Sequence, residues 1–209
     1  MTIIRQWAVT NSTRSDMRRL MNEDERILIR GEQFLPSING DSASWRKWDS
    51  LMEATRKIFG HNKPSRHVRD KGTGEMRPAR NTIMYHQILS FLADDCDING
   101  GKLASEGCMA YAKEYIEKYY ANHEVVYAVL KDRYVSDDIE NYVVHLIINR
   151  SDLSNGKRLN EGRADAIAKI HANRIRAMDM RWGLRQVKMG VANSQIHAKQ
   201  PSKYIREDS

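Results

Sequence analysis

Residues 142–150, which read YVVHLIINR, decide the fold of this chain. The run is apolar apart from His145, Asn149 and its last residue, so it predicts a buried β-strand with one imidazole near its middle. Residues 83–91, IMYHQILSF, predict a second strand with His86 at its centre. Residues 124–132, EVVYAVLKD, predict a third strand that ends in Asp132. An acidic loop separates this third strand from residues 142–150, and the two together predict an antiparallel hairpin.

Apolar residues at helical spacing predict helices around these strands, at residues 15–21, 45–59, 105–121 and 163–184. Residues 3–9 are short and apolar enough for a further strand. Residues 25–40 are ambiguous, because Gly31, Pro36 and Gly40 interrupt them. The order of elements predicts an α+β fold in which a central antiparallel sheet is flanked by helices, mainly on one face.

A chain of 209 residues is long enough for one well-buried domain. We expect a single domain over residues 1–188 and a polar tail over 189–209. Residues 61–80 read HNKPSRHVRDKGTGEMRPAR, and their prolines and glycines predict a long loop without regular structure. The cations of this basic loop are Lys63, Arg66, Arg69, Lys71, Arg77 and Arg80.

The formal net charge of +7 favours polyanionic partners, nucleic acid before membrane surfaces. The basic loop is either an arm that tracks phosphates or a solvated surface loop. No apolar run approaches the ~20 residues that span a bilayer. The first residues also lack the apolar core of a secretory signal, so we expect a cytoplasmic protein with no membrane partner. Cys96 and Cys108 are too few for a disulfide framework and predict reduced thiols.

Two histidines and one aspartate are candidates for a metal site. His145 and Asn149 share one face of their predicted strand, because residues an even number apart in a strand point the same way. His86 and Asp132 could approach that face from neighbouring strands, and two imidazoles with a carboxylate suit Mn, Mg with waters, or Zn. The same residues could equally be hydrogen-bonded polar groups of an ordinary sheet. No glycine-rich phosphate loop and no HExxH motif is present.

An ordered series of motifs resembles the nuclease domain of conjugative relaxases, the proteins of plasmid mobilisation. The series is MYHQILSF at 84–91, a tyrosine-rich helix, HEVVYAV at 123–129 and VHLIINR at 144–150. NGKRL at 155–159 and RWGL at 181–184 extend it over about residues 80–186. The resemblance implies a central antiparallel sheet, single-stranded DNA of a transfer origin as the partner, and other relaxosome proteins as further partners. It also implies that a tyrosine attacks the scissile phosphate while a histidine-bound divalent metal, Mg or Mn, polarises it.

The chain departs from the relaxase pattern at the residues that carry this chemistry. Val143 and Leu130 stand where the resemblance implies metal-binding histidines, and Leu20 stands where it implies the tyrosine nucleophile. The site that the resemblance leaves consists of His86, Asp132 and His145 as metal ligands, Tyr85 or Tyr134 as the nucleophile, and Asn149 as a neighbouring polar group.

Three functions are compatible with the sequence. The first is a relaxase that binds single-stranded origin DNA and nicks it by a tyrosine phosphodiester transfer with a divalent metal. The second is a catalytically inactive, relaxase-like DNA-binding accessory protein. It would grip phosphates with the basic loop and with Lys169, Arg174, Arg176 and Arg181 of the last helix. The third is a scaffold that resembles relaxases in structure alone. We predict relaxase-like DNA binding and place the nicking function first.

Overall fold

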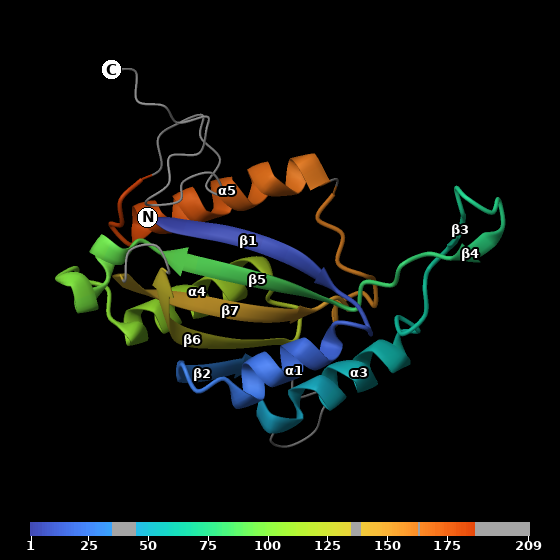
Figure 1. Ribbon diagram of the computed structural model, residues 1–209, viewed down its shortest axis with the longest axis horizontal. Coiled ribbons are helices and arrows are strands. Elements are labelled where there is room, and N and C mark those ends of the chain that lie inside the picture. Colours follow the sequence, from blue (N-terminus) through green and yellow to red (C-terminus); the bar gives the residue numbers. More distant parts are fainter. Residues whose placement is uncertain (35–44, 135–138, 163, 187–209) are drawn as a thin grey trace.

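In the computed structural model the chain forms a five-stranded antiparallel sheet with helices packed against it (Figure 1). The structure describes residues 1–34, 45–134, 139–162 and 164–186, so the predicted polar tail at 189–209 lies outside the described residues. The strands follow the order β1-β5-β7-β6-β2 across the sheet. Their bounds are β1 Thr2–Val9, β2 Ile27–Gln33, β5 Met84–Phe91, β6 Val125–Tyr134 and β7 Ile139–Asn149.

The stretch that decides the fold is the central strand β7. It pairs with β5 on one side and with β6 on the other, and both pairings are antiparallel. The predicted hairpin of β6 and β7 is therefore confirmed. His145 lies opposite Ile88 of β5 and Ala128 of β6, which fixes the position of its imidazole on the sheet.

Helices cover both faces of the sheet, so the prediction of helices mainly on one face is wrong. On one face, α1 (Arg14–Glu23) and α3 (Trp48–Ile58) pack over Val126, Ala128 and Ile147. On the other face, α4 (Ser105–Tyr119) and α5 (Ala164–Arg181) pack over side chains that include Val144, Leu146 and Ile148. We call these the α1–α3 face and the α4–α5 face. The apolar run of β7 is nearly continuous rather than alternating, as expected for a strand that is buried on both faces. Within the described residues, no helix combines the length and the apolar character needed to cross a membrane.

The edge strand β2 lies in the segment that the sequence left ambiguous. Gly31 interrupts its β pattern because α4 and the neighbouring strand approach closely there. A Cβ at Gly31 would lie 2.6 Å from Cζ of Tyr127 and would also collide with the end of the Met109 side chain. A side chain at this position would therefore force the Tyr127 and Met109 side chains to shift.

We expect Gly31→Ala to lower the free energy of unfolding by about 1–3 kcal/mol, because the added methyl group overpacks this contact. Urea denaturation would measure the change. Gly72→Ala is the matched control, since a Cβ there meets only the Asp70 carboxylate at 3.4 Å. Equal stability of the two variants would show that Met109 and Tyr127 move aside at little cost.

Residues 61–80 contain a short β-ribbon rather than a loop without regular structure, so that prediction is wrong. β3 (His67–Arg69) and β4 (Met76–Pro78) pair antiparallel and project from the body of the protein (Figure 1). Asp70 organises the turn: its carboxylate accepts hydrogen bonds from Gly72 N at 2.9 Å and from Arg77 Nε at 2.8 Å. Pro78 is tolerated because it ends a short strand at the edge of this ribbon. We call residues 61–80 the basic arm.

Three single-turn 3₁₀ helices complete the described structure. They are η1 Trp45–Lys47, which leads into α3, and η2 Ala93–Asp95 and η3 Asp97–Asn99, which follow β5.

Candidate functional site

Two imidazoles meet on the α1–α3 face of the sheet. His86 of β5 lies opposite Ile147, and His145 of β7 lies opposite Ile88, so the two histidines are diagonal neighbours on adjacent strands. Nε2 of His86 lies 2.9 Å from Nδ1 of His145, and the ring centroids are 5.1 Å apart in a stacked arrangement. One nitrogen of this contact donates the hydrogen bond and the other accepts it. The structure thus brings together both histidines that the sequence singled out.

Burial keeps both imidazoles neutral. Desolvation, helped by the neighbouring His145, lowers the pKa of His86 to about 3. Desolvation and the charge of Arg26 lower the pKa of His145 to about 4, although Asp24 acts in the opposite direction. At physiological pH the pair is therefore an uncharged aromatic unit.

A third ring, which the sequence did not single out, extends the pair. Trp7 of β1 lies opposite His86, with ring centroids 5.6 Å apart. Its side chain is 46% exposed, whereas Trp48 of α3 is buried. We call Trp7, His86 and His145 the ring row. The ring row crosses β1, β5 and β7. It could not be predicted from the sequence, because it depends on the order of these strands in the sheet.

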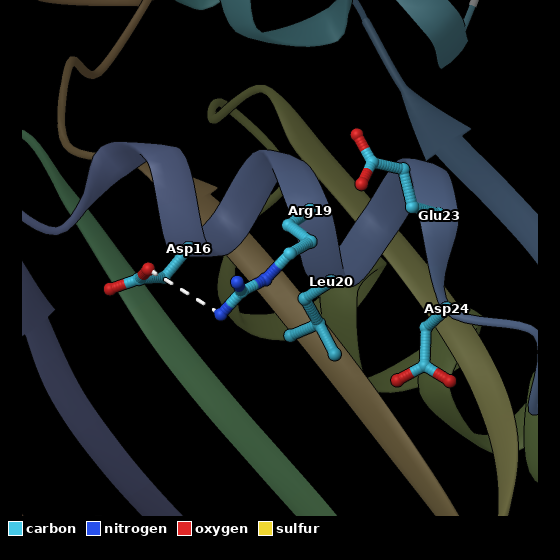
Figure 2. A pocket seen from close by; sticks show the side chains of 5 residues that line it. All are labelled: Asp16, Arg19, Leu20, Glu23 and Asp24. Atoms are coloured by element: carbon cyan, nitrogen blue, oxygen red, sulfur yellow. Dashed lines mark ion pairs between the residues drawn. The ribbon is translucent and has the colours of Figure 1, made fainter.

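Helix α1 contributes a pocket of about 440 Å³, shown in Figure 2. Leu20, which stands where the resemblance implies a tyrosine, lines this pocket, and α1 contains neither tyrosine nor histidine. The pocket wall is mainly acidic. The described residues that line it are Asp16, Arg19, Leu20, Glu23 and Asp24.

Asp132 does not join the two histidines. It lies four residues along β6 from Ala128, the residue opposite His145, which is about 14 Å of strand. Its carboxylate accepts a hydrogen bond from Arg26 Nη1 at 3.0 Å, and Arg26 Nη2 also binds Asp24 at 2.7 Å. Arg26 therefore pairs with both carboxylates.

The donor set at the imidazole pair does not fit a resident divalent metal. The two imidazoles use one nitrogen each to bond to one another, and protein metal sites usually supply three or more ligands. Among the described residues, no group of three or more His, Cys, Asp or Glu side chains could hold a metal ion. The structure thus supplies two of the three predicted ligands and separates the third.

Neither predicted tyrosine reaches the imidazole pair. Tyr85 precedes His86 in β5, so its side chain lies on the α4–α5 face, where its partner Ile148 packs. Tyr134 pairs with Ile139 at the far end of β6, about 20 Å of strand from Ala128. Tyr85 therefore faces away from the histidines, and the backbone of Tyr134 lies far from them.

Asn149 belongs to a buried polar network that ties β7 to α3. Its Nδ2 donates to Glu124 Oε2 at 2.6 Å, and its Oδ1 accepts from Arg56 Nη1 at 3.3 Å. Thr55 donates to the other Glu124 oxygen at 2.8 Å. These side chains are all buried, so the network joins helix to sheet away from solvent.

The cations proposed for phosphate contact differ in availability. All six of the basic arm are exposed, and Arg77 is engaged with Asp70. On α5, Arg174 donates to Glu161 at 2.6 Å and Arg181 pairs with Glu114. The basic arm therefore presents six exposed cations in one segment, whereas Arg174 and Arg181 of α5 are engaged with carboxylates and Lys169 is exposed.

Comparison with known proteins identifies the fold. No protein-family model and no curated protein sequence matches the chain. The MobM relaxase domain, bound to oriT DNA of plasmid pMV158 in a manganese-bound crystal structure, is 15% identical, with a TM-score of 0.54 over 97% of this chain and 95% of that one. The conjugative relaxase TrwC, in a metal-bound complex with oriT DNA, is 11% identical, with a TM-score of 0.51 over 90% of this chain and 74% of that one. The chain therefore has the α+β fold of the relaxases, as its sequence resemblance predicted.

Proposed function

We propose that this chain is a relaxase-like DNA-binding protein that acts as a catalytically inactive accessory in DNA mobilisation. The observation that carries the proposal is the basic arm, a β-ribbon that projects from the body with its cations exposed (Figure 1). Both relaxases of similar fold are in complex with oriT DNA. DNA of a transfer origin is the proposed partner, other relaxosome proteins would share the complex, and the cytoplasm is the corresponding location.

The shape of the arm suits duplex DNA. The major groove of B-DNA admits a two-stranded β-ribbon, and lysine and arginine side chains beside such a ribbon reach the phosphates on either side. Arg69 ends β3 and Lys71 lies in the turn that follows it. Lys63 and Arg66 precede the ribbon and Arg80 follows it, while the pairing of Arg77 with Asp70 holds the turn. The basic arm thus combines exposed positive charge with a β-ribbon of a size that the major groove admits.

Three observations argue against strand transfer at the imidazole pair. Leu20 lies where a nucleophile is implied, the predicted tyrosines lie elsewhere, and Asp132 lies four residues along β6 from the residue opposite His145. Loss of a nucleophile alone typically costs several orders of magnitude in rate. Binding is the activity that the remaining side chains support.

The test combines binding with a search for covalent product. The probe is a labelled random-sequence duplex with a single-stranded extension. Its binding is measured by fluorescence anisotropy in buffer that contains either Mn²⁺ or EDTA. We expect the affinity to agree within about twofold in the two buffers, because DNA is held by cationic side chains rather than through a metal. Incubation with a random-sequence single-stranded pool and Mg²⁺ or Mn²⁺ should give no protein–DNA adduct on a denaturing gel.

A metal-dependent adduct that disappears in Tyr85→Phe or in Tyr134→Phe would restore the nicking function. Absence of binding at low salt would instead favour a scaffold that shares only the relaxase fold.

A further inference from the structure

We propose that Trp7 is a stacking platform for an unpaired base at the end of the sheet from which the basic arm projects. This inference rests on the proposed DNA binding. It adds the residue that contacts an unpaired base.

The exposure of Trp7 is unusual for its position in the sheet. Ile3 and Val9 lie on the same face of β1 and are buried, whereas nearly half of the Trp7 side chain meets solvent. The helices of the α1–α3 face account for the difference, because Met21, Trp48 and Met52 pack over β6, β7 and the end of β1 at Val9. A large aromatic ring on a rigid strand is thus left partly uncovered.

The indole is held in place from one side. The His86 ring lies beside it at 5.6 Å and 36° between planes, and His86 is in turn held by its hydrogen bond to His145. His86 itself is only 9% exposed, so Trp7 is the accessible end of the row. A ring fixed before binding loses little conformational entropy when a base stacks on it. Stacking on an aromatic side chain also tolerates any sequence, because every base offers a π-face.

The position of the row fits a strand that leaves DNA held by the arm. The arm ends at Arg80, and β5 begins at Met84, two residues before His86. β1 ends at Val9, two residues after Trp7. The row and the base of the arm therefore lie at the same end of the sheet (Figure 1).

Charge also favours a nucleic-acid strand at this end. Arg5 shares the Trp7 face of β1, two residues away, and the arm adds its exposed cations beyond the start of β5. Both sources of positive charge would attract a phosphate backbone to the Trp7 end of the sheet.

The first experiment compares Trp7→Ala with the wild-type chain. The probes are a labelled single-stranded oligothymidylate and a duplex without overhangs, measured by anisotropy at fixed salt. We expect Trp7→Ala to weaken single-strand binding roughly tenfold, and Trp7→Phe to weaken it less, because the phenyl ring keeps part of the stacking. Duplex affinity should not change. Met180→Ala is the matched control, since Met180 is another exposed apolar side chain, 72% exposed, on the far face.

The second experiment locates the stacked base and guards against a folding defect. Each unpaired nucleotide of a duplex with a single-stranded extension is replaced in turn by an abasic site. One position should lose roughly tenfold in affinity with the wild-type chain and nothing further with Trp7→Ala. Equal losses in both proteins at every position would overturn the stacking role while leaving DNA binding intact. Failure of the wild-type chain to bind any of these probes would overturn the proposed function itself.

Discussion

Glu161→Ala is expected to lower the free energy of unfolding by about 3 kcal/mol, because it removes the anion at the centre of a buried network. Glu161 precedes α5, and its carboxylate is only 3% exposed. It accepts hydrogen bonds from Tyr120 Oη at 2.8 Å, from Arg174 Nη1 at 2.6 Å and from His171 Nε2 at 3.1 Å. Without it, the Arg174 guanidinium and two further donors lose their shared acceptor on the α4–α5 face.

Urea denaturation at neutral pH would measure this loss. Glu117→Ala is the matched control, because Glu117 is exposed on α4 and contacts Lys113 at 3.9 Å. Such surface pairs contribute ~0–1 kcal/mol. A Glu161→Ala chain as stable as the control would show that Arg174 and His171 find water or other partners on the surface of α5.

The same carboxylate should also give the stability a distinct acid dependence. Burial alone would raise the pKa of Glu161, but hydrogen bonds from His171, Tyr120 and Arg174, with the charge of His171, lower it from 4.5 to about 2. A lowered pKa in the folded state means that the stabilisation is complete above pH 4.5 and is lost as the pH falls towards 2. The difference in unfolding free energy between the wild-type chain and Glu161→Gln should therefore shrink across that window. A constant difference would mean that the Glu161 charge does not contribute.

The long elements could be predicted from the sequence because their signals are local. β5, β6 and β7 are apolar runs, and α4 keeps helical spacing over its whole length. β2 was missed because Gly31, which lies against the Met109 and Tyr127 side chains, weakens its pattern. The ribbon in the basic arm was missed because Asp70 organises a turn that the prolines and glycines around it obscured.

The candidate site was only partly predictable, because its geometry depends on strand order and register. The sequence indicated that His86 and Asp132 could approach the face of His145, and the register of β5, β6 and β7 puts all three on one face of the sheet. Alternation could not show that Asp132 lies four residues beyond the rung of His145. Alternation also could not predict that Trp7 belongs to the site, because Trp7 contacts His86 only through the pairing of β1 with β5. The resemblance to relaxases supplied the fold, which the residues alone had left at the level of an α+β sheet.

Removing four charges from the basic arm is expected to weaken duplex DNA binding on the order of a hundredfold at ~0.1 M salt. The variant carries Arg66→Gln, Arg69→Gln, Lys71→Gln and Arg80→Gln and keeps the Arg77–Asp70 pair that holds the turn. Since all four side chains are exposed, the free energy of unfolding should change by less than about 0.5 kcal/mol. The slope of log affinity against log salt should become shallower by up to about 0.9 for each charge that contacts a phosphate.

A control with the same net charge separates the arm from the general field of a basic protein. Lys102, Lys113, Lys118 and Lys169 are equally exposed but lie outside the arm, on α4 and α5 and just before α4. Replacing them with glutamine also reduces the formal net charge from +7 to +3. Long-range attraction depends on net charge, so the affinity for DNA should fall in both variants for this reason. The salt slope instead reports the counterions released by direct phosphate contacts. We therefore expect the control to keep nearly the wild-type salt slope. Equal slopes in the two variants would mean that the ribbon does not enter the DNA interface.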